Sequence, residues 1–124
     1  MAKIINGTSG NDSLTNTVSG AIINALGGKD TVNNTADKVT ITGGENNDSI
    51  NNGDWDNYGG SKVTIDGGAG NDLISLSSNA KNNVIQYSSE DGNDKIIGFN
   101  TTSTLKIGDG TGTYSSTKSG MIWF

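Results

Sequence analysis

The sequence predicts an all-β protein whose chain winds as a right-handed parallel β-roll, a β-solenoid of about five two-strand coils with a degenerate C-terminal coil. A short phrase, in which a glycine-rich turn is followed by an aspartate and then an aliphatic residue, recurs five times. The segments beside these turns alternate apolar and polar residues, as half-buried strands do. Helix is disfavoured, because no segment has apolar residues at helical spacing and 19 glycines are spread through the chain.

The aspartates of the five phrases lie 18, 18, 24 and 22 positions apart, and an aliphatic residue two positions after each marks one strand of the coil. The other strand precedes the glycine-rich turn. Seven residues before the aspartates stand Ile5, Ile23, Ile41, Ile65 and Tyr87, and two residues earlier stand Lys3, Ala21, Val39, Val63 and Ile85. We therefore expect a turn of constant length at the aspartates, and an opposite turn that takes all of the insertions.

The repeats divide the chain into two parts, with the β-roll in residues 1–98 and a degenerate terminal coil or cap in residues 99–124. In the second part Ile107 stands seven residues before Tyr114, which replaces the aspartate. A terminal repeat that departs from the pattern is typical of solenoids, because the last coil shields the stack. The apolar residues 121–124 either fold over the open end or belong to a longer array.

Composition excludes several classes of function. The net charge of −5 and the absence of arginine argue against nucleic acid and anionic membranes as partners. No segment approaches transmembrane length, so membrane insertion is not expected. An enzyme is not expected either, because histidine, cysteine and arginine, the usual members of nucleophilic and phosphoryl-transfer sites, are missing. The chain starts without an apolar secretory segment.

The repeated turns have the chemistry of a calcium site. Calcium takes six to eight oxygen ligands and accepts backbone carbonyls as well as carboxylates. Five stacked turns enclose four gaps, so we expect up to four Ca²⁺ ions, with the best sites in the gaps Asp48/Asp72 and Asp72/Asp94. Asp30 is the weakest candidate, because Ala25 and Leu26 replace glycines and Lys29 adds a positive charge. The candidate ligands are Asp12, Asp48, Asp72, Asp94, Gly43, Glu45, Gly67, Gly68, Ala69, Gly70, Asp91 and Gly92, with Asp30 doubtful.

With these motifs, residues 7–98 resemble the glycine- and aspartate-rich nonapeptide repeats of the RTX (repeat-in-toxin) family. The resemblance implies calcium binding between stacked turns, folding that depends on calcium, and type I secretion without an N-terminal signal to the extracellular space or cell surface. The family carries its motif on both edges of the roll, whereas here the turns opposite the aspartates lack it. Calcium is therefore expected along one edge only.

Other interpretations stay open. Gly-Asn-Asp sequences are also ordinary turns, in which the aspartate bonds its own backbone. The chain would then be a structural or adhesin spacer with little dependence on calcium. Trp55 and Tyr58, in the insertion 53–60, either bind a carbohydrate or cell-surface ligand or simply cover the edge of the coil. An ice-binding face is a further alternative, although the threonines do not repeat from coil to coil.

Overall fold

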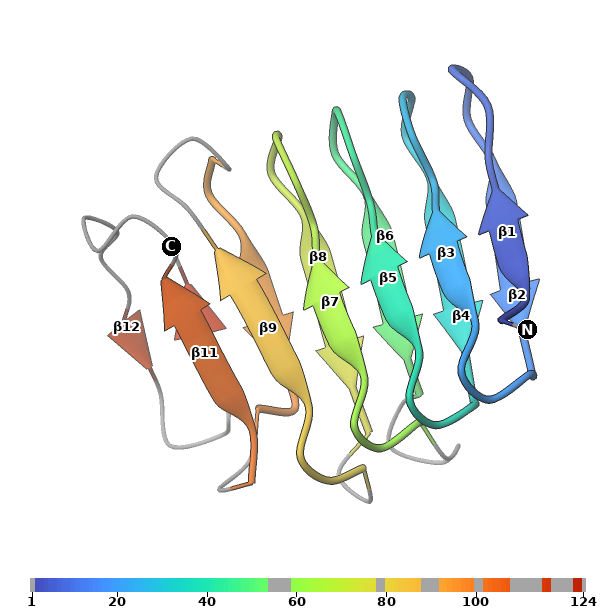
Figure 1. Cartoon of the computed structure of the whole chain (residues 1–124). Helices are drawn as coiled ribbons and strands as arrows, with labels where there is room; N and C mark the ends of the chain where they lie inside the picture. The colour runs from blue at the N-terminus through green and yellow to red at the C-terminus, as the bar shows by residue number, and fades with distance from the viewer. Residues whose placement is uncertain are drawn as a thin grey trace.

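The computed structural model describes residues 2–53, 59–77, 80–87, 92–99, 102–107, 115–116 and 122–123. The strands form two sheets that face each other along the length of the molecule (Figure 1). Sheet A contains, in spatial order, β1 (Ile4–Asn6), β3 (Ile22–Asn24), β5 (Thr40–Thr42), β7 (Thr64–Asp66), β9 (Val84–Tyr87) and β11 (Thr104–Ile107). Sheet B contains, from the same end, β2 (Ser13–Asn16), β4 (Thr31–Asn34), β6 (Ser49–Asn52), β8 (Leu73–Leu76), β10 (Lys95–Ile97), β13 (Ile122–Trp123) and β12 (Ser115–Ser116).

The chain passes alternately from one sheet to the other, which makes the fold a right-handed parallel β-roll (Figure 1). Each coil has a sheet A strand, a turn that ends at an aspartate, a sheet B strand and a return turn. We call the side of the roll that carries the aspartate turns the aspartate edge, and the side that carries the return turns the return edge. All pairings are parallel in sheet A, and in sheet B from β2 to β10. The predicted fold class is confirmed. The described part of the chain contains no helix of the length and apolarity needed to span a membrane.

The centre of the core consists of two facing columns of aliphatic side chains, one from each sheet, and Ala21, Val39 and Val63 add a buried column toward the return edge. Strand pairing places the members of each column in register, so that every side chain has its counterpart one coil away. Full burial of one such side chain contributes about 1.5–3 kcal/mol. The buried members are Ile23, Ile41, Ile65 and Ile85 in sheet A, and Val32, Ile50, Ile74 and Ile96 in sheet B.

The register of the fifth coil differs from the sequence prediction. Ile85, and not Tyr87, pairs with Ile65, and Leu105 rather than Ile107 continues the column. The aspartate-edge turn of this coil is therefore two residues longer than in the fourth coil, and the expected constant length is wrong here. Tyr87 lies at the start of the longer turn, and its hydroxyl donates a hydrogen bond to the carbonyl oxygen of Gly92 at 2.5 Å.

The return edge is organised by a column of buried asparagines that the sequence analysis did not single out. Asn16, Asn34 and Asn52 end β2, β4 and β6. Nδ2 of Asn16 donates to Oδ1 of Asn34 at 2.8 Å, and Nδ2 of Asn34 donates to Oδ1 of Asn52 at 2.9 Å. The signal in the sequence is an asparagine four residues after the aspartate in three successive repeats.

These asparagines also close the return turns, and one of them explains the insertion in the third coil. Asn34 bonds both the N–H and the carbonyl of Ala36, two residues later. Asn52 makes the same pair of bonds to Gly60, at 2.9 and 2.8 Å, although Gly60 is eight residues later. Residues 54–59 are therefore six extra residues in an otherwise unchanged turn. Trp55 and Tyr58 lie outside the described residues.

A second feature of the return edge is a column of residues with left-handed backbone conformation, each two positions before a sheet A strand. Gly20, Lys38, Lys62 and Asn82 have φ of 77°, 59°, 57° and 60°. A left-handed backbone costs a residue with a Cβ about 1–2 kcal/mol, so the stacked neighbours impose this turn whatever the side chain is. The lysine side chains are exposed, as is that of Lys81, which follows the same edge.

The C-terminal part first continues the roll and then reverses. β11 lies in the segment predicted to be the cap, and it pairs in parallel with β9. β13 runs antiparallel to β10, and β12 runs antiparallel to β13. Ile122 and Trp123, from the apolar end of the sequence, thus extend sheet B beyond β10. Tyr114 lies outside the described residues.

We predict that deletion of residues 54–59 leaves the roll folded. Joining Gly53 to Gly60 restores the two-residue distance that separates Asn34 from Ala36, so both Asn52 hydrogen bonds persist. Shortening a surface loop changes the closure entropy only slightly, so we expect the free energy of unfolding to change by less than about 1 kcal/mol. Chemical denaturation monitored by circular dichroism measures this change. Deletion of residues 36–41, which removes six residues from a strand and its turn, is the control and should abolish cooperative unfolding.

Candidate functional site

The five repeated aspartates form one column along the aspartate edge, each directly before a sheet B strand. Asp30, Asp48, Asp72 and Asp94 are 2–3% exposed, and Asp12, in the first coil, is half-buried. Carboxylates are rarely buried to this degree unless they are paired. The column therefore has to be explained by the contacts of each carboxylate.

One carboxylate oxygen of each aspartate from Asp30 to Asp94 joins two coils. Oδ1 of Asp30 accepts the backbone N–H of Asp12 at 2.8 Å, and the same bond runs from Asp30 to Asp48, from Asp48 to Asp72 and from Asp72 to Asp94, at 2.8, 2.8 and 2.9 Å. These N–H groups lie at the ends of turns, where the strand ladder has not yet begun, and burial would be costly without an acceptor. We call this series of bonds the aspartate ladder.

The other carboxylate oxygen differs between coils. Oδ2 of Asp12 accepts the backbone N–H of Thr8 at 2.6 Å, and the Thr8 hydroxyl lies 3.1 Å from both oxygens. Oδ2 of Asp30 and Oδ2 of Asp48 are buried and accept no hydrogen bond. At the position of Thr8 these coils have Leu26 and Gly44, which are left-handed with φ of 78° and 103°. The turns of the second and third coils thus leave an anionic oxygen without a donor.

This environment disfavours the charged form of the carboxylate. Burial raises the pKa of Asp48 from its ordinary value of 3.8 to about 6; the negative charge of Asp30 adds to this rise, and the hydrogen bond from the Asp30 N–H opposes it. The first glycine of the turn adjoins the same oxygen, since a Cβ at Gly43 would lie 2.7 Å from Oδ2 of Asp48. The space beside Oδ2 therefore depends on the absence of a side chain there.

The remaining predicted ligands are spread along the turns. Gly43, Gly67, Gly68 and Gly70 lie in the turns beside the column, while Glu45 and Ala69 are exposed on turn tips. Gly92 approaches the preceding turn at Gly70, and Asp91 lies outside the described residues. Within the described part of the chain, no three acidic side chains gather closely enough to hold a metal by themselves.

Asp30 was predicted to be the least suitable of the five, and its turn has Ala25 where the third coil has Gly43. It has the same ladder bonds and burial as Asp48, and its turn reaches the same shape with Leu26 in the left-handed position. Thr8, whose side chain and N–H donate to the carboxylate of Asp12, was not among the predicted residues. The only sequence signal for Thr8 was a hydroxyl residue four positions before an aspartate.

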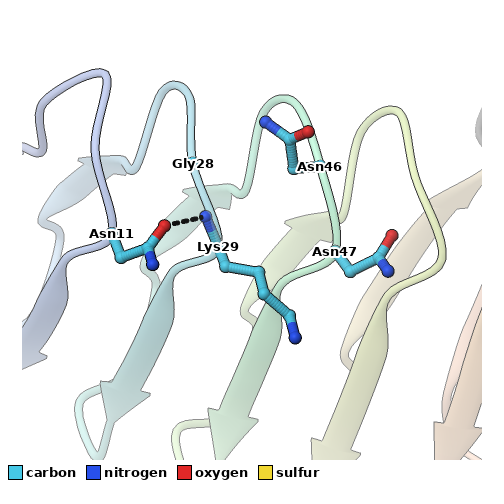
Figure 2. A pocket seen from close by; sticks show the side chains of 5 residues that line it. All are labelled: Asn11, Gly28, Lys29, Asn46 and Asn47. Carbon is cyan, nitrogen blue, oxygen red and sulfur yellow. Dashed lines mark hydrogen bonds between the residues drawn. The ribbon is translucent and has the colours of Figure 1, made fainter.

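A second, exposed ladder runs beside the aspartates through the residues that precede them. Oδ1 of Asn11 accepts the backbone N–H of Lys29 at 2.8 Å, Oδ1 of Asn47 accepts that of Asn71 at 2.7 Å, and Oδ1 of Asn71 accepts that of Asn93 at 2.9 Å. Lys29 interrupts this series, because its side chain has no acceptor for the N–H of Asn47. Figure 2 shows Asn11 bonded to the Lys29 backbone, while the Lys29 side chain extends away from the ladder across a shallow pocket.

A shallow groove runs along sheet B beside the column. Its lining comes from four successive strands of sheet B, β4, β6, β8 and β10, and the turns before them, and it includes Asp30, Asp48 and Asp72. The rest of the lining consists of Lys29, Thr31, Asn47, Ser49, Asn71, Leu73, Asn93, Lys95 and Ile97.

Neither family models, nor curated proteins, nor solved structures match this chain.

We predict that Lys29→Asn stabilises the protein by about 0.5–1.5 kcal/mol, the usual net value of one hydrogen bond. An asparagine at this position supplies the missing acceptor for the N–H of Asn47 and makes the exposed ladder continuous. Glu45→Asn, an exposed change in the adjoining turn, is the matched control and should change stability by less than about 0.5 kcal/mol. Urea denaturation of both variants measures the difference, and equal midpoints for the two would contradict the prediction.

We also predict that the metal-free protein becomes more stable as the pH falls from 7 to 5. The folded pKa of Asp48, about 6, lies above its ordinary value of 3.8, so the folded state binds the proton more tightly. The resulting stabilisation is complete below the unfolded pKa and is lost as the pH rises through the folded pKa. Melting temperatures in chelator between pH 4.5 and 7.5 test this.

The companion variant is Asp48→Asn, which keeps the Oδ1 acceptor and removes the charge. It should stabilise the metal-free protein at pH 7 by about 1–3 kcal/mol, the value of a shift of one to two pKa units. It should also flatten the pH dependence. A metal-free wild-type protein that is most stable at pH 7, or a destabilised Asp48→Asn protein, would show that the carboxylate is favourable in its charged form.

Proposed function

We propose that this chain is a calcium-binding β-roll module whose aspartate edge binds the ions. The observation that carries the proposal is the pair of buried oxygens, Oδ2 of Asp30 and Oδ2 of Asp48, that accept no hydrogen bond. An anionic oxygen in this position requires either a proton or a cation. The chain carries a net charge of −5 and has no arginine, so a bound cation is the charge partner that its composition favours at neutral pH.

The residues present fit such an ion in donor type. The aspartate edge offers only oxygen donors, namely one buried carboxylate per coil and the carbonyls of closely stacked turns. A Cβ added at Gly70 would lie 2.4 Å from the carbonyl oxygen of Asn46, which shows how near the turn carbonyls of one coil come to the next turn. Since no three acidic side chains gather among the residues that the structure describes at this edge, backbone carbonyls and water would complete the six to eight ligands of calcium.

Calcium bound at this edge would neutralise the buried carboxylates and couple ion binding to folding. The core is thin and only 31% of the residues are hydrophobic, so little apolar burial offsets the entropy lost on folding. An ion that binds only the folded state adds about 2.7 kcal/mol per site at a hundredfold excess over its Kd. By its resemblance to RTX repeats, the module would belong to a secreted or cell-surface protein and would fold after export.

A second candidate function is that of a structural or adhesin spacer that needs no calcium. The aspartate ladder itself favours this alternative, because Oδ1 of each aspartate from Asp30 to Asp94 already accepts a backbone N–H from the neighbouring coil. In this case the carboxylates join the coils and bind no ion. The two functions differ in what calcium does to stability, and the same measurement therefore separates them.

We expect millimolar calcium to raise the melting temperature above that in chelator, and isothermal titration calorimetry to count at least one ion per chain. Magnesium is the control, because it demands octahedral geometry and gives up water reluctantly. An identical melting temperature with calcium and with chelator would reject calcium binding and leave the spacer function.

Two matched variants locate the ions. The glycine content of the turns predicts that Asp72→Asn removes more bound calcium than Asp30→Asn. The similar burial and ladder bonds of the two aspartates predict comparable losses instead. Glu45→Gln, in an exposed turn tip, should leave the stoichiometry unchanged. If Glu45→Gln reduces binding as much as the aspartate variants do, the ions lie on the turn tips and the buried column is not the site.

A further inference from the structure

The first aspartate of the column differs from the next two in how its charge is balanced. The backbone N–H of Thr8 donates to Oδ2 of Asp12 at 2.6 Å, and the Thr8 hydroxyl lies 3.1 Å from each carboxylate oxygen. The same hydroxyl accepts the backbone N–H of Gly10 at 3.1 Å, so its own proton is directed toward the carboxylate. Hydrogen bonds to a carboxylate stabilise its charged form. Thr8 therefore compensates the charge of Asp12 from within the chain.

The aspartates of the second and third coils lack such a donor. Asp30 and Asp48 are buried, and their Oδ2 atoms accept no hydrogen bond from the residues that the structure describes. At the position of Thr8, four residues before the aspartate, these coils have Leu26 and Gly44. A buried anionic oxygen is unfavourable unless a donor, a proton or a cation lies beside it. The requirement for a cation therefore begins at the second coil.

The backbone of the turn is the origin of this difference. Leu26 and Gly44 are left-handed, with φ of 78° and 103°, and Gly68 at the same position of the fourth coil has φ of 85°. Thr8 is not among the residues with positive φ in the described part of the chain. Its branched Cβ disfavours the left-handed conformation. The side chain of Thr8 thus helps to hold the turn in the conformation that presents an N–H to the aspartate.

The turns with left-handed residues present carbonyl oxygens to the neighbouring coil. The carbonyl oxygen of Leu26 accepts the N–H of Glu45 at 2.9 Å. A Cβ at Gly44 would overlap this same oxygen, and a Cβ at Gly68 would overlap the carbonyl oxygen of Gly44. Carbonyl and carboxylate oxygens together are the donor set that calcium accepts. The same turn therefore exists in two forms, one that supplies a hydrogen-bond donor to its aspartate and one that brings oxygen atoms to the gap between coils.

We infer that Thr8 takes the place of the cation at the first aspartate, so that the first coil binds no ion and the calcium-dependent part of the roll begins at the second coil. This inference rests on the proposed function, and it assigns the ions to coils whose turns contain the left-handed residue. The carboxylate of Asp12 then accepts the hydrogen bonds of Thr8 and is not a calcium ligand, although its sequence motif resembles that of the other coils.

The same substitution, aspartate to asparagine, should act differently in the two kinds of coil. In calcium, isothermal titration calorimetry should count as many ions on Asp12→Asn as on the wild type, and at least one fewer on Asp48→Asn. In chelator, Asp12→Asn should lower the melting temperature, because an amide accepts the Thr8 bonds less strongly than a carboxylate does. Asp48→Asn should raise it, because a buried charge without a donor is removed. Loss of the same number of ions from both variants would overturn the inference.

Thr8→Val tests the donor itself, because valine keeps the branched Cβ and removes the hydroxyl. In chelator it should lower the melting temperature by about 2–8 °C, as expected for one lost hydrogen bond in a chain of this size. Thr8→Ser keeps the hydroxyl and is the matched control, with a melting temperature within about 2 °C of the wild type. Equal melting temperatures for Thr8→Val and Thr8→Ser would show that the hydroxyl does not compensate Asp12, and the inference would fail.

The titrations also separate this inference from the proposed function. A wild-type chain that binds no calcium would reject the proposed function, and the assignment of ions to coils with it. A wild-type chain that binds calcium, together with an Asp12→Asn variant that loses an ion, would reject only the role of Thr8.

Discussion

The hydrogen bond from a backbone N–H to the aspartate of the next coil is the interaction on which the roll depends. The turns at the aspartate edge contain little apolar surface, and strand pairing begins only after the aspartate. Without Oδ1 of Asp30, Asp48 and Asp72, the N–H groups of the preceding aspartates would be buried without acceptors. At the return edge, the side chains of the buried asparagines bond one another from coil to coil. Two side-chain ladders thus hold the coils at both edges, and the aliphatic columns fill the space between them.

In the aspartate ladder, Oδ1 stabilises the contact between coils, whereas burial of the second carboxylate oxygen, Oδ2, is unfavourable. A carboxylate is a better acceptor than an amide, but each aspartate brings a second oxygen that must also be satisfied. Thr8 meets this need in the first coil, whereas the left-handed turns of the next two coils do not. Asparagine would serve the ladder without this cost, as Asn16 and Asn34 show at the other edge. Aspartate rather than asparagine stands at all five positions, and this is why we propose a bound cation at this edge.

Periodicity in the sequence was sufficient to predict the fold class, the two sheets and the place of each aspartate in its coil. It could not give the register of the fifth coil, because Ile85 and Tyr87 are both apolar and two residues apart, so either satisfies the alternation of a strand. It also gave no bond directions. An aspartate beside a glycine-rich turn is compatible with a shared ion or with an N–H from the next coil, and only the three-dimensional structure shows where Oδ1 points. The asparagines stand at a constant distance after the aspartates in the sequence, but only the structure shows that they bond one another and close the return turns.

The lysines of the return edge have an electrostatic consequence. Lys3, Lys38, Lys62 and Lys81 expose their ammonium groups along this edge, while the repeated aspartates lie along the other. The separation gives the roll an electric dipole across its width, parallel to the strands. Such a field draws small cations toward the aspartate edge and turns the lysine edge toward any anionic surface. In the described part of the return edge, Asp37 is the one exposed acidic residue beside these four lysines, so this side is basic although the chain as a whole is acidic.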